Sequence, residues 1–157
     1  MMKLRAMLLV AFSALVFGTL LGPAAAQLPK PMKESEIKAA GGRQIPGPEL
    51  KQQWVGNTVY VLVLKKFGAA GVPGAVIANY YPNERTRRQK FPGTQKTIET
   101  NWWMDGNNRC VEEKGATISG HLCSTAWELA GTFYLCFQPD GDCAMSFRNV
   151  PGNPESL

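Results

Sequence analysis

Four cysteines in the C-terminal half constrain the fold of this chain more than any other feature. Cys110, Cys123, Cys136 and Cys143 lie in a stretch with alternating apolar and polar residues and frequent turn residues. Their gaps are long and irregular, no C-x-x-C motif occurs, and His121 is the single histidine. These features argue against a metal site. We therefore expect two disulfide bonds that staple a small β structure.

The cysteines allow three pairings, of which we favour Cys110–Cys123 and Cys136–Cys143. Each of these bonds would close one hairpin, with closed loops of 14 and 8 residues. On the chain-entropy model such loops contribute about 3 and 2.5 kcal/mol to stability. The nested pairing, Cys123–Cys136 with Cys110–Cys143, remains an alternative.

The register of the second hairpin bears on this choice. A three-residue turn at 139–141 would place Phe133 opposite Phe147 and Leu135 opposite Met145. That register matches apolar side chains well, but it sends the two cysteines to opposite faces. A β-bulge at the glycine of this turn would bring them together.

The N-terminal residues have the pattern of a secretory signal peptide. Lys3 and Arg5 precede an apolar run over residues 6–21, and small residues lead to a cleavage site after Ala26. The run is shorter than the ~20 residues that span a bilayer, and nothing later in the chain is long and apolar enough to do so. We therefore expect residues 1–26 to be removed, and the mature chain to be periplasmic or secreted.

The mature chain reads as one domain. Residues 27–47 are rich in Pro, Lys and Gly, so we expect a flexible N-terminal segment with little structure of its own. A helix is predicted to begin at Pro48 and to end before Gly56. We expect residues 48–150 to form the disulfide-stabilised β domain and 151–157 to form a tail.

Strand patterns recur every 8–12 residues after the helix, and turn residues separate them. The clearest alternation runs from Thr97 to Met104, and it predicts that Trp102 points inward and Trp103 outward. The eight predicted strands are 58–64, 75–81, 86–91, 97–104, 109–112, 118–123, 132–138 and 143–148. The expected fold is mainly β, a small antiparallel β-barrel or sandwich of about eight strands with a short N-terminal helix.

Several short motifs carry a resemblance to a known family. They are Gly56-Asn57-Thr58-Val59-Tyr60, Tyr80-Tyr81, Trp103 followed by Asp105-Gly106, Cys110, Cys123 and Gly131-x-x-Tyr134. Over residues 48–148 the chain resembles a family of small, uncharacterised secreted proteins of Gram-negative bacteria with a lipocalin-like (calycin-like) β domain. The resemblance implies a compact barrel, although the second cysteine pair and the Pro-rich start depart from the family pattern. The family has no established activity, so the resemblance supplies no functional residues.

A basic run between residues 84 and 90 is the strongest local charge feature. Arg85, Arg87, Arg88 and Lys90 could bind an anionic component of the cell envelope. The alternative is a solvated β arm, and alternating side chains suggest that both of its faces lie in water. Removal of the signal peptide lowers the formal charge from +5 to +3 (5 − 2), a modest value that argues against nucleic acid as the partner of an exported protein.

Aromatic and catalytic candidates are fewer. Trp103 and Trp127 could form an aromatic binding surface, although core packing of both is the common alternative. His121 lacks a neighbouring pattern of nucleophile and base, so we predict no enzyme activity, no metal and no cofactor.

The sequence therefore predicts an exported binding domain. Its ligand would be a small amphipathic molecule or an envelope component. A protein-interaction module is the alternative, and an envelope hydrolase would need a pocket that joins His121 to a carboxylate. The interior discriminates between these readings, because a barrel that is filled by its own side chains has no room for a ligand.

Overall fold

The computed structural model describes residues 28–66, 71–112 and 120–157. The predicted signal peptide and the predicted start of a strand at Ile118 lie outside these residues. The elements in chain order are β1 (Met32–Lys33), α1 (Glu34–Ala39), β2 (Arg43–Gln44), α2 (Gly47–Trp54), β3 (Asn57–Val63), β4 (Val76–Tyr80), β5 (Thr86–Lys90), β6 (Thr97–Asp105), β7 (Asn108–Glu112), β8 (His121–Leu129), β9 (Thr132–Phe137) and β10 (Asp142–Pro151). None of the helices in these ranges is long and apolar enough to cross a membrane.

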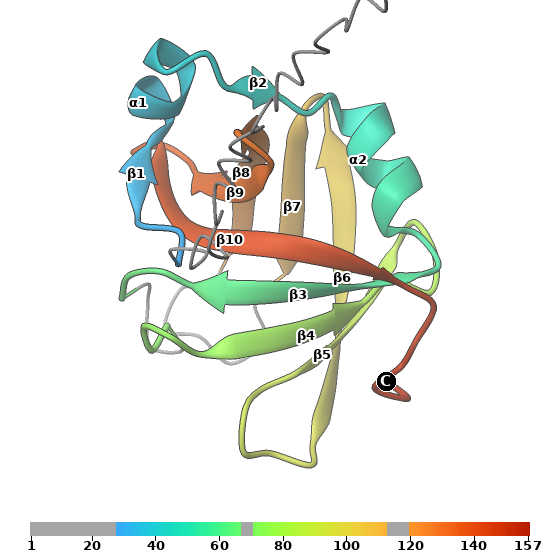
Figure 1. The fold of residues 1–157 in the computed structure, drawn as a ribbon. Helices are drawn as coiled ribbons and strands as arrows, with labels where there is room; N and C mark the ends of the chain where they lie inside the picture. The colour runs from blue at the N-terminus through green and yellow to red at the C-terminus, as the bar shows by residue number, and fades with distance from the viewer. Residues whose placement is uncertain (1–27, 67–70, 113–119) are drawn as a thin grey trace, which may run out of the picture.

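Strands β3 to β10 form a closed antiparallel barrel (Figure 1). Each strand pairs with the next in the chain, and β10 returns to pair with β3, where Phe147 lies opposite Val61. Closure leaves no free edge among these eight strands. The predicted eight-stranded antiparallel barrel is confirmed, and the sandwich alternative is wrong.

The alternation of side chains is clear on β3. Val59, Val61 and Val63 of β3 are buried in the main core, and the register carries this inward face from strand to strand. Trp102 is buried and Trp103 is half-buried on the opposite face of β6, which confirms the predicted orientation of both.

Helix α2 covers one end of the barrel (Figure 1). Pro48 lies in its first turn, as predicted, and Gly56 follows its end with a positive φ of 79°. The Trp54 ring lies 5.0 Å from the ring of Tyr81 and 5.3 Å from that of Phe147. An aromatic cluster therefore fills this end of the interior.

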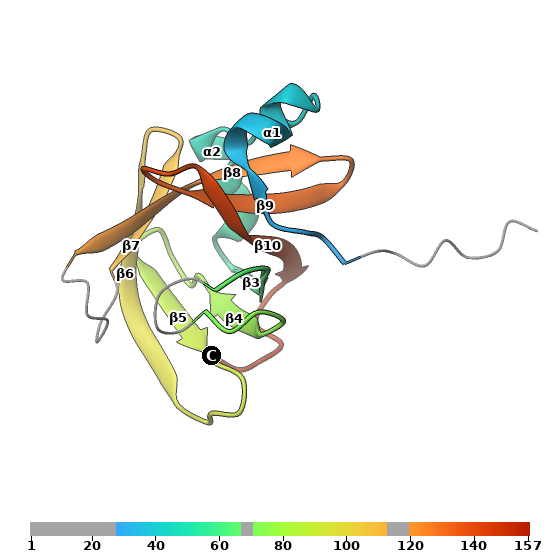
Figure 2. The same cartoon turned by 90° about the vertical axis from the view of Figure 1, so that its left-hand side faces the viewer.

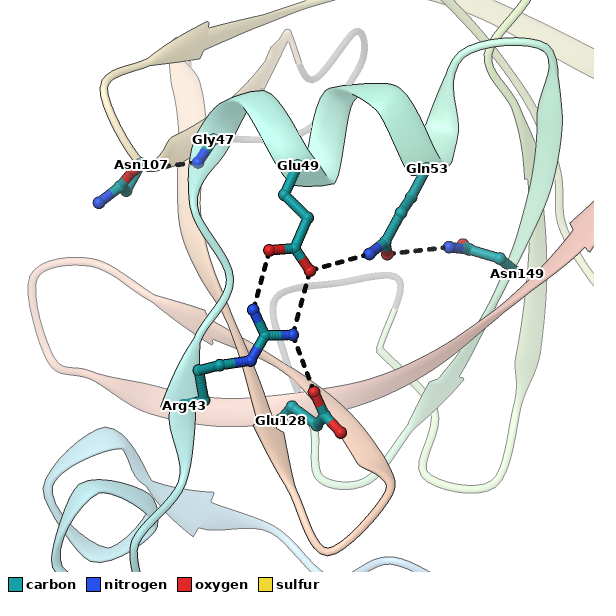
Figure 3. Close-up of polar contacts among 7 residues, drawn as sticks. All are labelled: Arg43, Gly47, Glu49, Gln53, Asn107, Glu128 and Asn149. Atoms are coloured by element: carbon teal, nitrogen blue, oxygen red, sulfur yellow. Dashed lines mark hydrogen bonds and ion pairs between the residues drawn. The ribbon is translucent and has the colours of Figure 1, made fainter.

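A polar network fixes α2 in this place (Figure 3). Arg43 of β2 donates two hydrogen bonds to the carboxylate of Glu49, at 2.8 and 3.0 Å, and a third at 3.0 Å to Glu128 of β8. The Gly47 N–H donates to Asn107 Oδ1 at 2.9 Å. A Cβ at Gly47 would lie 2.1 Å from the Gly106 carbonyl oxygen, so the close approach of α2 to the β6–β7 turn requires glycine.

The N-terminal segment differs from the prediction. Residues 32–44 form β1, α1 and β2, of which β1 pairs with β10 and β2 pairs with β8. Ile37 of α1 is 0 % exposed and packs against Trp127 and Tyr134 in a second core, beside the β8–β10 part of the barrel (Figure 2). The expectation of a flexible segment is wrong here, because strand pairing and burial of Ile37 hold it.

Both disulfide bonds join neighbouring strands. Cys110 pairs with Cys123 across β7 and β8, and Cys136 pairs with Cys143 across β9 and β10. The hairpin pairing is confirmed and the nested one is wrong. A register shift between Cys143 and Met145 reconciles the facing cysteines with the predicted apolar register. The bulge therefore lies at Ala144, three residues after the predicted position at Gly141. Two disulfide bonds indicate an oxidising location outside the cytoplasm.

Candidate functional site

The four basic residues of the predicted anion site do not lie together. Arg85 is exposed, and Arg88 is half-buried with its Nε 3.0 Å from Glu99 Oε2. Arg87 is 2 % exposed, and its Nε donates to Thr100 Oγ1 at 3.0 Å inside the barrel. Lys90 is half-buried on the outer face.

The expectation that both faces of this arm lie in water is therefore wrong. Strand β5 pairs with β4 and β6 within the closed barrel, so one of its faces must point inward. Arg87 and Gln89 take that face, and both are buried. A polar pattern on a strand does not reveal closure, which depends on its neighbours.

The two tryptophans of the predicted aromatic surface also have different environments. Trp127 is 5 % exposed because α1 covers it, so its prediction as a surface residue is wrong. Trp103 is half-buried, and its ring lies 5.5 Å from the imidazole of His121 on the outer face. Neither of the two cavities described below includes His121.

A small cavity of about 50 Å³ lies in the interior of the barrel. Its lining residues are Val61, Ile77, Asn79, Arg87, Gln89, Arg109, Val111, Leu122, Leu135, Phe137 and Met145. Sites for organic ligands typically measure about 300–1,000 Å³. This cavity is too small for an amphipathic molecule, so enclosure of such a ligand within the interior does not fit the structure.

A larger open groove of about 420 Å³ lies on the outside of the barrel. Its lining residues are Tyr60, Val76, Ala78, Lys90, Phe91, Pro92, Gly93, Thr94, Gln95 and Glu155. They come from β3, β4, β5, the β5–β6 connection and the C-terminal residues. The groove has the volume of a small-molecule site, and we refer to it below as the outer groove.

The floor of the outer groove follows from the strand register. Tyr60 lies opposite Ala78, and Ala78 lies opposite Lys90, so these outward side chains form a row across β3, β4 and β5. The small alanine between two long side chains leaves a depression. Val76, two residues before Ala78 on the same face, is 47 % exposed and adds apolar surface.

One wall of the groove is the β5–β6 connection. The Thr94 N–H donates to the Phe91 carbonyl oxygen at 3.2 Å, and Gly93 has a φ of 73° that favours glycine. The Thr94 hydroxyl lies 3.1 Å from the same oxygen. This turn holds the half-buried Phe91 beside the floor.

The opposite wall comes from the C-terminal residues. The Tyr60 hydroxyl donates to Glu155 Oε1 at 2.7 Å, and the Arg148 guanidinium lies 4.5 Å from the centre of the Tyr60 ring. The hydrogen bond to Glu155 raises the pKa of Tyr60 above its ordinary value, and burial and the charge of Glu155 add to this effect. The residues expected to form a tail therefore contribute to the groove.

Charge is distributed unevenly over the groove. Glu155 is engaged with Tyr60, whereas Lys90 forms no ion pair with any residue that the structure describes. A free ammonium group beside apolar side chains suits a ligand with an anionic head and an apolar body.

Sequence reasoning identified Lys90 but missed the other residues of the groove. Tyr60 belongs to one of the motifs that carry the family resemblance, and Val76 and Ala78 fall within a predicted strand, but none of the three has a local pattern that indicates binding. Their common site depends on the pairing of three strands and on the C-terminal residues folding back. No local pattern in the sequence carries that information.

Comparison with protein-family models, with curated proteins and with solved structures found no match. The resemblance to lipocalin-like secreted proteins therefore stays a prediction.

Proposed function

We propose that this protein is an exported, non-enzymatic binding protein whose site is the outer groove. In this proposal residues 1–26 direct export and are cleaved near Ala26, and the mature protein acts in the periplasm or outside the cell. Its ligand is a small amphipathic anion, such as a lipid component of the envelope. The observation that carries the proposal is the outer groove itself, which has a volume of about 420 Å³ against about 50 Å³ in the interior.

The two parts of the ligand would contact different residues. The apolar body would lie on Val76, Ala78 and Phe91, where burial of apolar surface contributes roughly 25 cal/mol per Å². The anionic head would lie at Lys90, because Glu155 at the other wall repels negative charge. Lys90 is half-buried, which reduces the screening of its charge by solvent.

A hydrolase receives less support from the geometry. His121 lies opposite Glu112 in the β7–β8 pair, but it is exposed on the outer face, where its ring contacts that of Trp103. It borders neither the groove nor the interior cavity.

Calorimetric titration with decanoate, at concentrations below micelle formation, tests the proposal. Lys90→Gln should weaken binding about tenfold, which corresponds to ~1.4 kcal/mol. Ala78→Phe should abolish binding by filling the depression in the floor. Lys51→Gln is a matched control, because Lys51 lies on α2 and pairs with Glu84 away from the groove.

Added salt should weaken binding to the parent protein and should affect Lys90→Gln less, because it screens the ammonium group. Decanoate binding that is absent, or that is equal in the parent protein and in folded Lys90→Gln and Ala78→Phe variants, would contradict the proposal.

A further inference from the structure

A polar arc inside the barrel takes no part in the function proposed above. The inward-facing polar residues are Asn79, Arg87, Gln89, Thr100, Arg109 and Ser124, and all six are buried. The register places Asn79 opposite Gln89, Arg87 opposite Thr100, and Arg109 opposite Ser124. The arc therefore spans β4 to β8 on the inner face of the barrel.

Arg109 is the residue of this arc whose charge is least compensated. It is 5 % exposed. Its Nη1 lies 3.5 Å from Ser124 Oγ, which is a long contact, and its guanidinium lies 5.4 Å from the centre of the Trp54 ring. Its Nε is buried without a hydrogen-bond partner, and Arg109 forms no ion pair within the described ranges.

This arrangement is costly unless a further partner is present. Arginine keeps its charge at every pH that a folded protein experiences, so it does not become neutral as a buried lysine does. A buried charge requires a counter-charge or hydrogen bonds to replace its lost hydration. The cation–π contact with Trp54 supplies part of this compensation. The Nε–H group still has no hydrogen-bond partner among the described residues.

The cavity beside Arg109 has the size and lining for a single small ion. Its volume of about 50 Å³ is less than twice the ~30 Å³ share of one water molecule in the liquid. Its polar lining consists of Asn79, Arg87, Gln89 and Arg109. The Arg109 Nε–H group is the donor without a partner, whereas Asn79 Nδ2 already donates to the carbonyl oxygens of Val59 and Ile77, at 3.4 and 3.3 Å. Among the residues that the structure describes, the rest of the lining is apolar and contains no carboxylate.

We propose that the interior of the barrel binds a chloride-sized monovalent anion, held by Arg109 together with the other polar residues of the cavity. The anion accepts the hydrogen bond that Arg109 Nε does not make within the protein. An organic carboxylate with more than a few atoms, or a phosphate ester, exceeds the cavity. This site is independent of the outer groove and of its ligand.

Chloride NMR on the full mature protein tests this site. The protein is kept at constant ionic strength in sodium gluconate, whose anion is too large for the cavity, and chloride is added in small amounts. The ³⁵Cl line should broaden beyond the buffer value, and nitrate should compete and reverse most of the excess width. Arg109→Gln should lose the excess width, whereas Arg85→Gln, which changes an exposed arginine, and Lys90→Gln, which changes the groove, should retain it.

A second measurement covers the case in which Arg109→Gln does not fold. Crystals of the unchanged protein grown in sodium bromide should show an anomalous peak within hydrogen-bonding distance of Arg109 Nε. Excess line width that persists in a folded Arg109→Gln variant would overturn the proposal, as would bromide found only on the surface or water alone in the cavity. Chloride binding in Lys90→Gln without decanoate binding would separate this site from the groove.

Discussion

The interior of the barrel and the outer groove share the strands β3, β4 and β5, but only the groove has room for an organic ligand. Gln89 and Lys90 are neighbours on β5, and one lines the interior cavity while the other lines the groove. Large side chains fill the interior down to about 50 Å³, whereas Ala78 between longer side chains leaves room outside. A closed barrel of eight strands is just wide enough for its own side chains, so closure does not by itself provide a ligand site.

The largest expected effect is the difference in stability between a variant in the interior and a variant in the groove. Trp54→Ala should lower the free energy of unfolding by about 3–5 kcal/mol, because it leaves a cavity among Tyr81, Trp102 and Phe147. Val76→Ala in the groove should change it by less than about 0.5 kcal/mol, since Val76 is largely exposed. Denaturant titration of both variants measures the difference. Equal losses of stability would remove the distinction between the two regions.

The second prediction concerns the outer face of the barrel that α1 covers, where side chains are as buried as those of the interior. Ile37→Ala should cost about 2–5 kcal/mol, because Ile37 is fully buried against the face of the barrel that α1 covers. Thermal unfolding followed by circular dichroism gives the result, and Lys38→Ala on the same helix is the control. If both variants unfold like the parent, residues 27–47 act as the flexible segment that the sequence suggested.

The third prediction is that two arginines of the basic run contribute differently to stability. Arg87→Ser should cost about 1–3 kcal/mol, because it removes a buried side chain that hydrogen-bonds to Thr100. Arg85→Ser should cost at most a few tenths of a kcal/mol, because Arg85 is exposed. A comparison of urea midpoints measures this split. Similar midpoints for the two variants would mean that β5 lies in water on both faces.

The smallest expected effect lies at the wall of the groove. Tyr60→Phe removes the hydroxyl that bonds to Glu155 and should cost about 0.5–1.5 kcal/mol at neutral pH. Because the pKa of Tyr60 is raised in the folded state, its contribution is present below pH ~10 and is lost as the pH rises through the folded value. Stability curves of the parent and Tyr60→Phe should therefore converge above that pH. Curves that stay parallel would show that this hydrogen bond contributes nothing.

These contrasts also explain which features of the structure can be predicted from the sequence. Local patterns predict eight strands, the orientation of Trp102 and Trp103, and the hairpin pairing of the cysteines, because each depends on residues close together in the chain. The bounds of one strand are wrong, because β8 continues to Leu129, beyond the predicted end at Cys123. The apolar register of β9 and β10 even requires the bulge that the structure contains near Cys143.

The failures arise where distant segments meet. Arg87 reads as a surface residue until closure of the barrel assigns one face of β5 to the interior. Trp127 reads as an aromatic surface until α1 covers it. Strands β1 and β2 have two residues each, too few to show an alternating pattern, and their pairing with β10 and β8 holds them in place.

The most direct test of the account is to map where an amphipathic anion binds. In a ¹⁵N–¹H NMR titration with decanoate, the amides of Val76, Ala78, Lys90 and Gly93 should shift in a saturable manner. Those of Val111, Leu122 and Leu135, which line the interior cavity, should stay in place. Saturable shifts confined to the interior residues would place the ligand inside the barrel and would contradict the outer groove as the binding site.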